Sequence, residues 1–195
     1  SESSQACWPT VSRAVKALTG AIARILEGLL LTAEEVPRDC DYVVDGTLFP
    51  CWSWRNHREL WSGKHKATGM NVQILVLPDG GLVWASDPYP GSMHDVAALD
   101  ASGLLEGMDP SGWIGDKGYV GRGMITPHKK PPTANRARPR RRPTRASTGS
   151  AGPKERTIAH IKSWRILHTP YRRPLETFEQ TITAALALYS FTTTP

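Results

Sequence analysis

Two short apolar runs separated by a single tight turn place the strongest limit on how this chain folds. Residues 71–77 and residues 82–85 are rich in Val, Ile, Leu and Trp, and residues 78–81 between them read Pro-Asp-Gly-Gly. Proline and glycine favour the backbone angles of a turn, and strands joined by so short a turn pair antiparallel. The sequence therefore predicts a β-hairpin over residues 71–85.

The other predicted elements fit around this hairpin as a layered α/β fold. An earlier strand is predicted at residues 41–49, and a helix at residues 94–105 precedes a short strand at residues 113–115. Apolar residues that recur every three or four positions predict two further helices, at residues 155–167 and 175–191. Antiparallel strands followed by a crossover helix and another strand form a mixed sheet flanked by helices. This order of elements resembles the ribonuclease H-like fold.

The N-terminal part is predicted to form one amphipathic helix over residues 11–31. Its apolar residues recur at three- and four-residue steps, and Thr10 is a suitable N-cap. The start of this helix is similar to the recognition helix of a helix-turn-helix, where short polar side chains and an arginine reach DNA. The alternative is a plain packing helix. We therefore divide the chain into a partial helix-turn-helix-like region at residues 1–35 and a main domain at residues 36–191.

The positive charge of the chain is concentrated in one segment. The net charge is +6, and eight cations stand together without an intervening acid: Lys129, Lys130, Arg136, Arg138, Arg140, Arg141, Arg142 and Arg145. Subtracting these eight from +6 leaves −2 for the remaining residues. A polyanion such as DNA is the natural partner of such a segment, although a solvated loop has the same composition. Residues 131–153 lack aromatic and large aliphatic side chains, so they are predicted to form a disordered basic insert.

The sequence gives no sign of a membrane protein. It has no run of about 18 apolar residues, which a membrane-spanning helix requires. The first ten residues do not combine a basic stretch with a following apolar one, so no secretory signal is predicted. We expect a cytoplasmic protein whose partners do not include a membrane.

Three carboxylates stand where the predicted fold would bring them together. Asp45 lies in the first strand, Asp116 follows the strand after the crossover helix, and Glu155 opens the helix after the insert. Taken singly, each has a bland alternative: a turn acid for Asp45 and Asp116, and a helix-terminus acid for Glu155. Taken together, carboxylates beside apolar strands need a counter-charge. Mg²⁺ prefers oxygen ligands, and two ions suit phosphodiester cleavage.

Six short motifs occur in a characteristic order along the chain. They are Val-Val-Asp-Gly-Thr at 43–47, Gly-Lys-His-Lys at 63–66, Tyr-Pro-Gly-Ser-Met-His-Asp at 89–95, Gly-Asp-Lys-Gly-Tyr at 115–119, Glu-Arg at 155–156 and Lys-Ser-Trp-Arg-Ile-Leu at 162–167. This series resembles the DDE superfamily endonucleases of the Harbinger-like type. It is similar to bacterial insertion-sequence transposases of the fifth (IS-five) group. The resemblance extends from about Thr10 to Phe191, except for residues 131–153.

The resemblance implies a DNA transposase that cuts and rejoins DNA at transposon terminal inverted repeats. It implies Asp45, Asp116 and Glu155 as ligands of Mg²⁺ or Mn²⁺, with two ions in the site. Asp95 is a rival for the second ligand position, and the sequence leaves both choices open. Transposases commonly pair two DNA ends, so a homodimer associated with the bacterial nucleoid is expected.

Basic and aromatic residues near the acids are further candidates for the site. The predicted DNA contacts are Lys64, His65, Lys66, Lys117, Arg156 and Lys162. A solvated turn is the alternative for residues 64–66. His94 either orients Asp95 or a water molecule, or has a structural role. Trp52 and Trp54 either stack on bases or pack in the core.

One stretch departs from the family pattern. Relatives have an apolar helix leading into the third acid, whereas this chain has the basic insert there, with only Asn135 and Arg136 as a trace of that helix. Our hypothesis is that residues 131–153 are out-of-frame sequence between two compensating frameshifts, which re-reading the coding DNA tests. Glu155 would then be poorly placed. One alternative function is therefore a catalytically inactive DNA-binding remnant. A separate alternative is a ribonuclease H-like nuclease unrelated to transposition.

Overall fold

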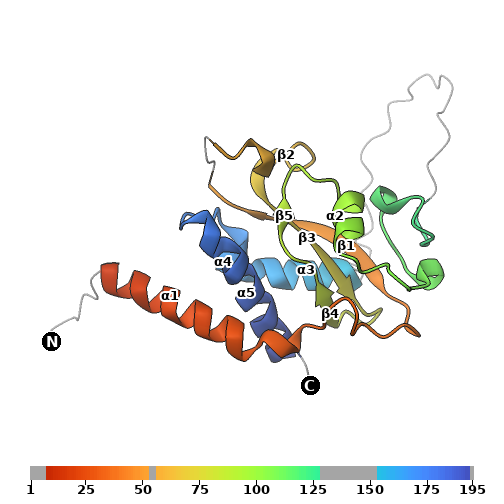
Figure 1. The fold of residues 1–195 in the computed structure, drawn as a ribbon, viewed down its shortest axis with the longest axis horizontal. Helices are drawn as coiled ribbons and strands as arrows, with labels where there is room; N and C mark the ends of the chain where they lie inside the picture. The colour runs from red at the N-terminus through yellow and green to blue at the C-terminus, as the bar shows by residue number, and fades with distance from the viewer. Residues whose placement is uncertain (1–7, 53–55, 128–152, 194–195) are drawn as a thin grey trace, which may run out of the picture.

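A five-stranded sheet forms the centre of the molecule (Figure 1). The computed structural model describes residues 8–52, 56–127 and 153–193, and the fold is given for these ranges. The strands are β1 (Val43–Pro50), β2 (Trp61–Ser62), β3 (Ala67–Val76), β4 (Leu82–Ala85) and β5 (Tyr89–Pro90). β1 pairs antiparallel with most of β3, from Val43 opposite Val76 to Pro50 opposite Gly69. The other edge of β3 pairs in turn with β2, β5 and β4.

The hairpin predicted at residues 71–85 is confirmed as β3, a tight turn and β4. The N–H of Gly80 donates to the carbonyl oxygen of Leu77 at 2.8 Å, and the N–H of Leu77 donates to Gly81 at 2.9 Å. Gly80 has a φ of 104°, which a glycine adopts without strain. β2 and β5 were not predicted, because two residues are too few to carry an alternating pattern.

Parallel pairing extends the sheet beyond β1. Ile114 forms isolated parallel bridges with Val43 on one side and with Ile125 on the other. The predicted strand at residues 113–115 is thus reduced to a single bridge residue, although its position beside β1 agrees with a mixed sheet. The N–H of Val44 donates to the carbonyl of Ile114 at 2.9 Å and fixes this contact.

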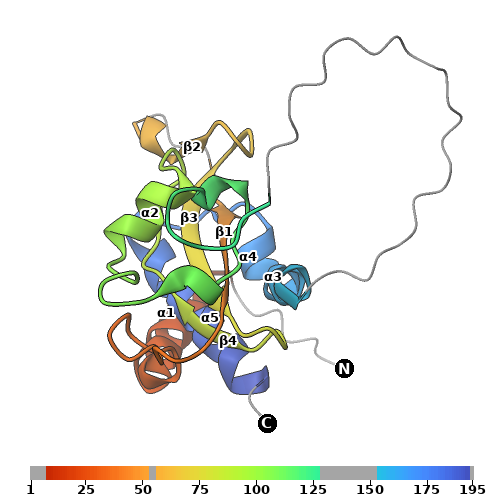
Figure 2. The ribbon, with the colours of Figure 1, turned by 90° about the vertical axis from the view of Figure 1, so that its right-hand side faces the viewer.

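Helices cover the two faces of the sheet unequally. α3 (Pro153–Ser163), α4 (Arg165–His168) and α5 (Phe178–Thr193) pack on one face of β1 and β3, and α2 (Asp95–Ala101) packs on the other. Figure 2 shows α3 and α2 on opposite sides of the two strands. Because β3 is covered on both faces, its side chains alternate between two core clusters. Those of Met70, Val72, Ile74 and Val76 pack with the C-terminal helices, and Leu75 packs on the α2 side. The architecture is therefore a mixed α/β fold with helices on both faces of the sheet.

Several predicted helices differ from the observed ones at their ends. α1 (Trp8–Ile25) begins before Thr10, so Thr10 lies inside the helix and is not its N-cap; the 3-10 turn η1 (Glu27–Leu29) follows. α2 ends at Ala101, short of the predicted residue 105, because Gly103 adopts a φ of 71° that does not fit a right-handed helix. The predicted helix 155–167 is interrupted at Trp164, whose extended ψ of 114° separates α3 from α4. The predicted helix 175–191 is α5, preceded by the 3-10 turn η5 (Leu175–Thr177).

The N-terminal helix packs against the body mainly through α5. The guanidinium of Arg173 donates to the carbonyl of Ser12 at 2.8 Å and adds a polar anchor. The apolar stripe predicted for residues 11–31 is only partly buried, since Leu18 is 61% exposed and Ile25 is 78% exposed. Residues 1–7, which a preceding helix of a helix-turn-helix would need, lie outside the described residues.

The structure describes almost none of the predicted basic insert. The disorder predicted for residues 131–153, and the frameshift hypothesis for them, fall almost wholly outside the described residues. Within the described ranges, no helix combines the length and the apolar character needed to cross a membrane.

Candidate active site

Three of the predicted acids come from separate elements. Asp45 is half-buried in β1, on the strand face that also carries Val43 and packs toward α3. Asp95 is the first residue of α2, on the other side of the sheet. Asp116 is the N-cap of the 3-10 turn η4 (Lys117–Tyr119), and its Oδ1 accepts the N–H of Gly118 at 2.6 Å. Local turn chemistry therefore fixes Asp116, whereas the strand and the helix fix the other two.

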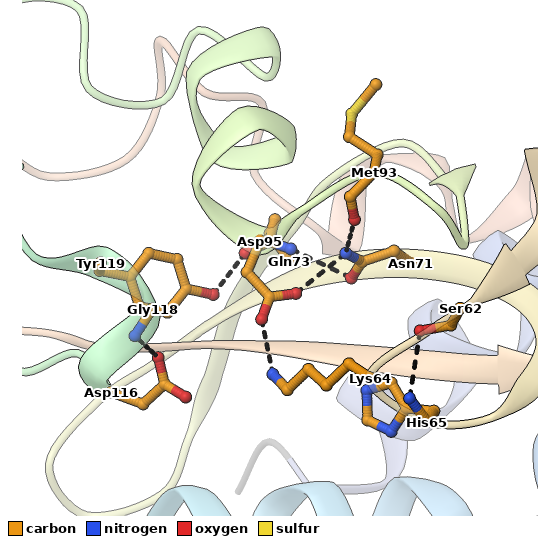
Figure 3. Close-up of polar contacts among 10 residues, drawn as sticks. All are labelled: Ser62, Lys64, His65, Asn71, Gln73, Met93, Asp95, Asp116, Gly118 and Tyr119. Carbon is orange, nitrogen blue, oxygen red and sulfur yellow. Dashed lines mark hydrogen bonds and ion pairs between the residues drawn. The ribbon is translucent and has the colours of Figure 1, made fainter.

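Lys64 brings a positive charge to these acids. It lies in the turn between β2 and β3, and its Nζ donates to Asp95 Oδ2 at 2.6 Å (Figure 3). The Asp95 side chain is only 11% exposed, whereas that of Lys64 is 53% exposed. Partial desolvation lowers the pKa of Lys64, but its hydrogen bond to Asp95 raises it, as do the charges of Asp95, Asp116 and Asp45. The net pKa of Lys64 lies above its ordinary value, which indicates that all three acids lie within electrostatic reach of one ammonium.

The buried side chain of Tyr119 lies within electrostatic reach of the same three acids. Burial raises the pKa of the Tyr119 hydroxyl, and three negative charges raise it further: those of Asp95, Asp45 and Asp116. A phenol that borders all three carboxylates is disfavoured as a phenolate and remains a hydrogen-bond donor. The side chain of Tyr119 thus lies beside the acids, although the sequence motif gave no role to it.

Two more predicted DNA contacts approach the cluster from different elements. Burial lowers the pKa of Lys162 in α3, and the charge of Asp45 opposes this effect. Partial burial lowers the pKa of His65, and the positive charges of Lys64 and Lys162 lower it further. The grouping therefore includes Asp45, Lys64, His65 and Lys162, contributed by a strand, a turn and a helix.

The loop that follows Asp116 is tied to the helix that carries Asp95. The guanidinium of Arg122 donates to Asp100 of α2 through Nε at 2.7 Å and through a terminal nitrogen at 2.5 Å. A bidentate arginine–carboxylate pair fixes orientation as well as distance. It holds the segment around η4 against α2, so the two candidates for the second ligand belong to one packed unit.

A small cavity opens beside Asp95. It has a volume of about 170 Å³ and lies between the turn that carries Lys64 and the segment before α2. His65 and His94 line it together with Asn71. His94 occupies the N-cap position of α2 without a side-chain capping hydrogen bond, so its ring does not serve as the cap of that helix. The cavity places two histidines and a lysine next to a carboxylate.

Other predicted site residues are not grouped with the acids by the contacts described. Lys66 lies in the β2–β3 turn with a left-handed φ of 50°. Arg156 lines a different cavity of about 550 Å³, beside the β3–β4 turn, whose lining includes none of the three acids. Trp52 is 50% exposed, and its ring lies 4.7 Å from the guanidinium of Arg172, so it is not a core residue.

Three predicted positions remain without a described environment or role. Glu155 lies in the first turn of α3, but its side chain is outside the described part of the structure. Trp54 is also outside it. Lys117 begins η4 directly after Asp116 and remains a predicted DNA contact.

Sequence reasoning missed two polar side chains of the site, Asn71 and Gln73. Both belong to β3, are buried, and point to the same side of the strand. Their signal was present as two amides at alternate positions in a strand that is otherwise apolar on both sides. A strand buried on both faces reads as a nearly continuous apolar run, so polar residues with period two within it mark a buried polar contact.

The donor chemistry of this cluster fits a hard divalent cation. Carboxylate oxygens are the ligands that Mg²⁺ and Mn²⁺ prefer, and Asp45 and Asp116 approach the same region from different elements. Across the described residues, no group of three or more His, Cys, Asp or Glu side chains is arranged to hold a metal ion. The Glu155 side chain lies outside the described residues and therefore outside that search.

The chain is similar to known proteins over most of its length. The model of the DDE superfamily endonucleases matches residues 44–190, which is most of the chain. A protein of Streptomyces albus G, assigned as a putative transposase for the insertion sequence element IS112, is 28% identical over 138 residues. The match covers 67% of this chain and 50% of the relative, so the chain spans about half the length of that relative. No solved structure matches the chain significantly.

Proposed function

This chain belongs to the DDE superfamily endonucleases, and from that membership we propose that it is a DNA transposase. Metal-dependent cleavage would occur at the transposon ends, and the freed 3′-hydroxyl would then join target DNA. One observation carries the proposal: Asp45, Asp95 and Asp116 come from three separate elements, and all three lie within electrostatic reach of the Lys64 ammonium, which donates to Asp95 Oδ2 at 2.6 Å. A nuclease needs such a cluster of acids and not a single one.

The arrangement of the sheet supports a ribonuclease H-like fold as the scaffold. An antiparallel β1–β3–β4 unit is followed by a helix and by a parallel neighbour of β1 at Ile114. The second parallel bridge, to Ile125, continues on the same side. In this order Asp45 belongs to β1, and Asp116 follows Ile114, the residue that bridges to β1. This arrangement supports the proposal that the two acids serve one site.

We propose Asp45, Asp116 and Glu155 as the residues that hold Mg²⁺ or Mn²⁺, with Asp95 as the rival for the second position. When bound, two such ions activate the attacking water and stabilise the leaving oxygen of a phosphodiester. The protein contributes the fixed placement of the acids: a strand for Asp45 and an N-cap hydrogen bond for Asp116. The ammonium of Lys64 limits the repulsion among the carboxylates.

DNA is the proposed substrate and partner, in the form of terminal inverted repeats and target DNA. The ammonium groups of Lys64 and Lys162 lie within electrostatic reach of the acids, and cations at these places neutralise the phosphates of a bound strand, while the imidazole of His65 adds a neutral hydrogen-bonding group beside them. The predicted contacts at Lys66, Lys117 and Arg156 belong to the same proposal. We also propose that the enzyme acts as a homodimer at the bacterial nucleoid and belongs to the IS-five, Harbinger-like group. Sedimentation velocity tests the dimer.

A second candidate function is a catalytically inactive DNA-binding remnant. The observation that favours it is the composition of residues 131–153, which replace the apolar lead-in to Glu155 with prolines and arginines. Such a protein would bind DNA through its cations without cutting it.

The test is nicking of DNA that carries the terminal repeats of the element, with Mg²⁺ or Mn²⁺ and with EDTA as a control. The transposase proposal expects metal-dependent cuts at the repeat ends that Asp45→Asn abolishes while DNA binding remains. Asp39→Asn, which changes an exposed acid outside the cluster, is the matched control and should cut normally.

The outcomes separate the candidate functions. Cutting that survives Asp45→Asn would refute the metal assignment. Binding without cutting would favour the inactive remnant. Hydrolysis without joining of the 3′ end would favour a nuclease unrelated to transposition.

A further inference from the structure

A row of buried polar side chains connects the turn after Asp116 to the helix that carries Asp95 (Figure 3). The Tyr119 hydroxyl donates to Gln73 Oε1 at 2.5 Å. Gln73 Nε2 donates to Asn71 Oδ1 at 3.1 Å, and Asn71 Nδ2 donates to Asp95 Oδ1 at 2.9 Å. Three hydrogen bonds therefore join η4 to α2 across one face of β3.

Every donor in this row points the same way. Tyr119 has only one hydroxyl hydrogen, each amide accepts on its oxygen and donates from its nitrogen, and the last acceptor is the carboxylate of Asp95. Aligned hydrogen bonds in a low-dielectric interior polarise and strengthen one another. The row suits an ionised Asp95, because a carboxylate accepts hydrogen bonds on both oxygens. Asp95 Oδ2 indeed accepts the ammonium of Lys64.

The burial of these groups is difficult to explain by stability alone. Tyr119 and Gln73 are fully buried, and Asn71 is 5% exposed. Burying amides and hydroxyls costs free energy that their hydrogen bonds only roughly offset. Apolar side chains of the same shape would fill the space with little or no loss of stability. What the polar row contributes, and apolar side chains would not, is a fixed position for the acids.

The strand that carries Asp45 is shaped to admit the row. A Cβ atom on Gly46 would overlap Asp95 Oδ1 and lie 2.9 Å from Gln73 Nε2, closer than real contacts allow. Only glycine lets both groups rest directly against β1, one residue after Asp45. The row is thus in contact with the backbone beside the first acid, and it joins the segments that carry the other two.

We propose that Tyr119, Gln73 and Asn71 are positioning residues that fix Asp95, and through it the ammonium of Lys64, within electrostatic reach of Asp45 and Asp116. Both oxygens of Asp95 are engaged in this arrangement, by Asn71 and by Lys64. Within the described residues Asp116, by contrast, accepts a hydrogen bond on Oδ1 alone, so Asp95 is assigned as the positioning acid and Asp116 as the second metal ligand. This inference rests on the proposed function, and its test includes a measurement that needs no metal.

The test compares two tyrosine-to-phenylalanine variants. Tyr119→Phe removes only the hydroxyl that begins the row. Tyr42→Phe is the matched control, because Tyr42 is 1% exposed and its hydroxyl donates to the carbonyl of Pro37 at 2.9 Å, outside the row. Urea unfolding establishes that both variants fold. If Tyr119→Phe does not fold, Gln73→Met interrupts the row at its centre and replaces it in each measurement.

The first measurement is the affinity for Mn²⁺ by titration calorimetry. Partners that orient metal ligands typically change affinity by about 10- to 100-fold when removed. Tyr119→Phe is expected to weaken Mn²⁺ binding by about 10-fold, whereas Tyr42→Phe should bind as the unmodified protein does. Asp116→Asn should weaken Mn²⁺ binding more than Asp95→Asn; the reverse order would overturn the assignment of Asp95 as a positioning acid.

The second measurement is the rate at which an amine-reactive ester acylates Lys64, relative to Lys66 in the same turn, read by mass spectrometry without metal. The ion pair with Asp95 masks Lys64, so the Lys64 to Lys66 ratio should rise severalfold in Tyr119→Phe and in Asp95→Asn. It should not change in Tyr42→Phe. An unchanged ratio in Tyr119→Phe overturns the proposal, even if Mn²⁺ affinity falls.

The two measurements also separate the two proposals. If the unmodified protein binds no Mn²⁺, the metal-dependent function fails, while the acylation ratio still decides whether the row positions Asp95 and Lys64. If Mn²⁺ binds and neither measurement responds to Tyr119→Phe, the row is only structural and the inference is wrong.

Discussion

At the scale of single residues, Gly46 is the position where one methyl group would disturb the site most directly. Gly46→Ala forces Asp95 and Gln73 away from β1, since the added Cβ would lie within 3 Å of both. We expect about 1–3 kcal/mol of destabilisation from overpacking and about a 100-fold decrease in cutting, because a displacement of about 1 Å costs that much. Urea unfolding and nicking measure the two effects.

Gly63→Ala is the control for this prediction. Gly63 precedes Lys64 in the turn, and a Cβ there meets nothing within 4 Å. The control should keep both stability and cutting. If Gly46→Ala and Gly63→Ala cut DNA at equal rates, the close packing inferred around Gly46 is wrong.

A second residue-scale prediction concerns pH. Partial burial and the charges of Lys64 and Lys162 lower the folded-state pKa of His65 below its ordinary value of 6.5. Between the lowered pKa and 6.5 the unfolded chain binds more protons, so stability rises with pH in this window and decreases as the pH falls below about 6.5. Urea unfolding between about pH 7.5 and about pH 5.5 should show a smaller slope in His65→Gln. If the unfolding free energies of His65→Gln and the original protein depend on pH in the same way, burial and the two lysines do not lower the pKa of His65 in the folded state.

At the scale of elements, a hydrogen bond from a buried threonine joins α3 to the β3–β4 turn. Thr157 is 3% exposed, and its Oγ1 donates to the carbonyl of Gly80 at 2.6 Å. Thr157→Val keeps the shape and removes the donor, so we expect about 1–2 kcal/mol of destabilisation. Cutting should also fall, because Glu155 lies two residues earlier in the same helix.

The control for α3 is Thr183→Val on α5. Thr183 is exposed and its Oγ1 donates only within its own helix, to Glu179 at 3.2 Å. Thr183→Val should change the free energy of unfolding by no more than about 0.5 kcal/mol. If Thr157→Val has no larger effect than this control in unfolding experiments, the turn does not anchor α3.

Elements with strong local signals could be predicted from the sequence, and those that depend on distant contacts could not. The β3–β4 hairpin was predicted because the Pro-Asp-Gly-Gly turn specifies it within a few residues. Ile114 was assigned a strand but forms only bridges, because its pairing depends on Val43, far away in the sequence, and on Ile125. The interruption at Trp164 also has no signal in helical periodicity.

Some residues of the candidate site could likewise be predicted from local sequence motifs, and others could not. Asp45, Asp95, Asp116 and Lys64 were proposed from short motifs, and the structure groups them. The contribution of Asn71 and Gln73 depends on which side of β3 they face and on Tyr119, 46 residues after Gln73. Motif matching does not weigh amides inside an apolar strand, so the buried row appeared only with three-dimensional packing.

At the scale of the whole molecule, the residues proposed to cut DNA and the residues proposed to bind DNA nonspecifically belong to different parts of the sequence. The three acids, Lys64 and Lys162 belong to the part of the chain that the structure describes, and the eight clustered cations belong to the sequence segment 129–145. Replacing Arg140, Arg141 and Arg142 by glutamine should weaken DNA binding at low salt. The slope of log affinity against log salt should flatten by about 0.9 for each phosphate that is no longer neutralised.

The control removes the same number of cations from α1. Arg13, Lys16 and Arg24 change to glutamine, and filter binding at several salt concentrations compares the two triple variants. If α1 causes the larger change in slope, the N-terminal helix holds DNA and the basic segment does not.

The buried row from Tyr119 to Asp95 also predicts which positions change first when a copy of the gene is no longer selected for transposition. A copy released from selection for transposition still needs a foldable core while it is expressed, and apolar replacements at Asn71, Gln73 and Tyr119 would satisfy that need. These three positions should therefore drift toward Leu, Met and Phe in decayed copies before the surrounding core changes. Their polar character in this chain is what we expect of a lineage that was mobile until recently.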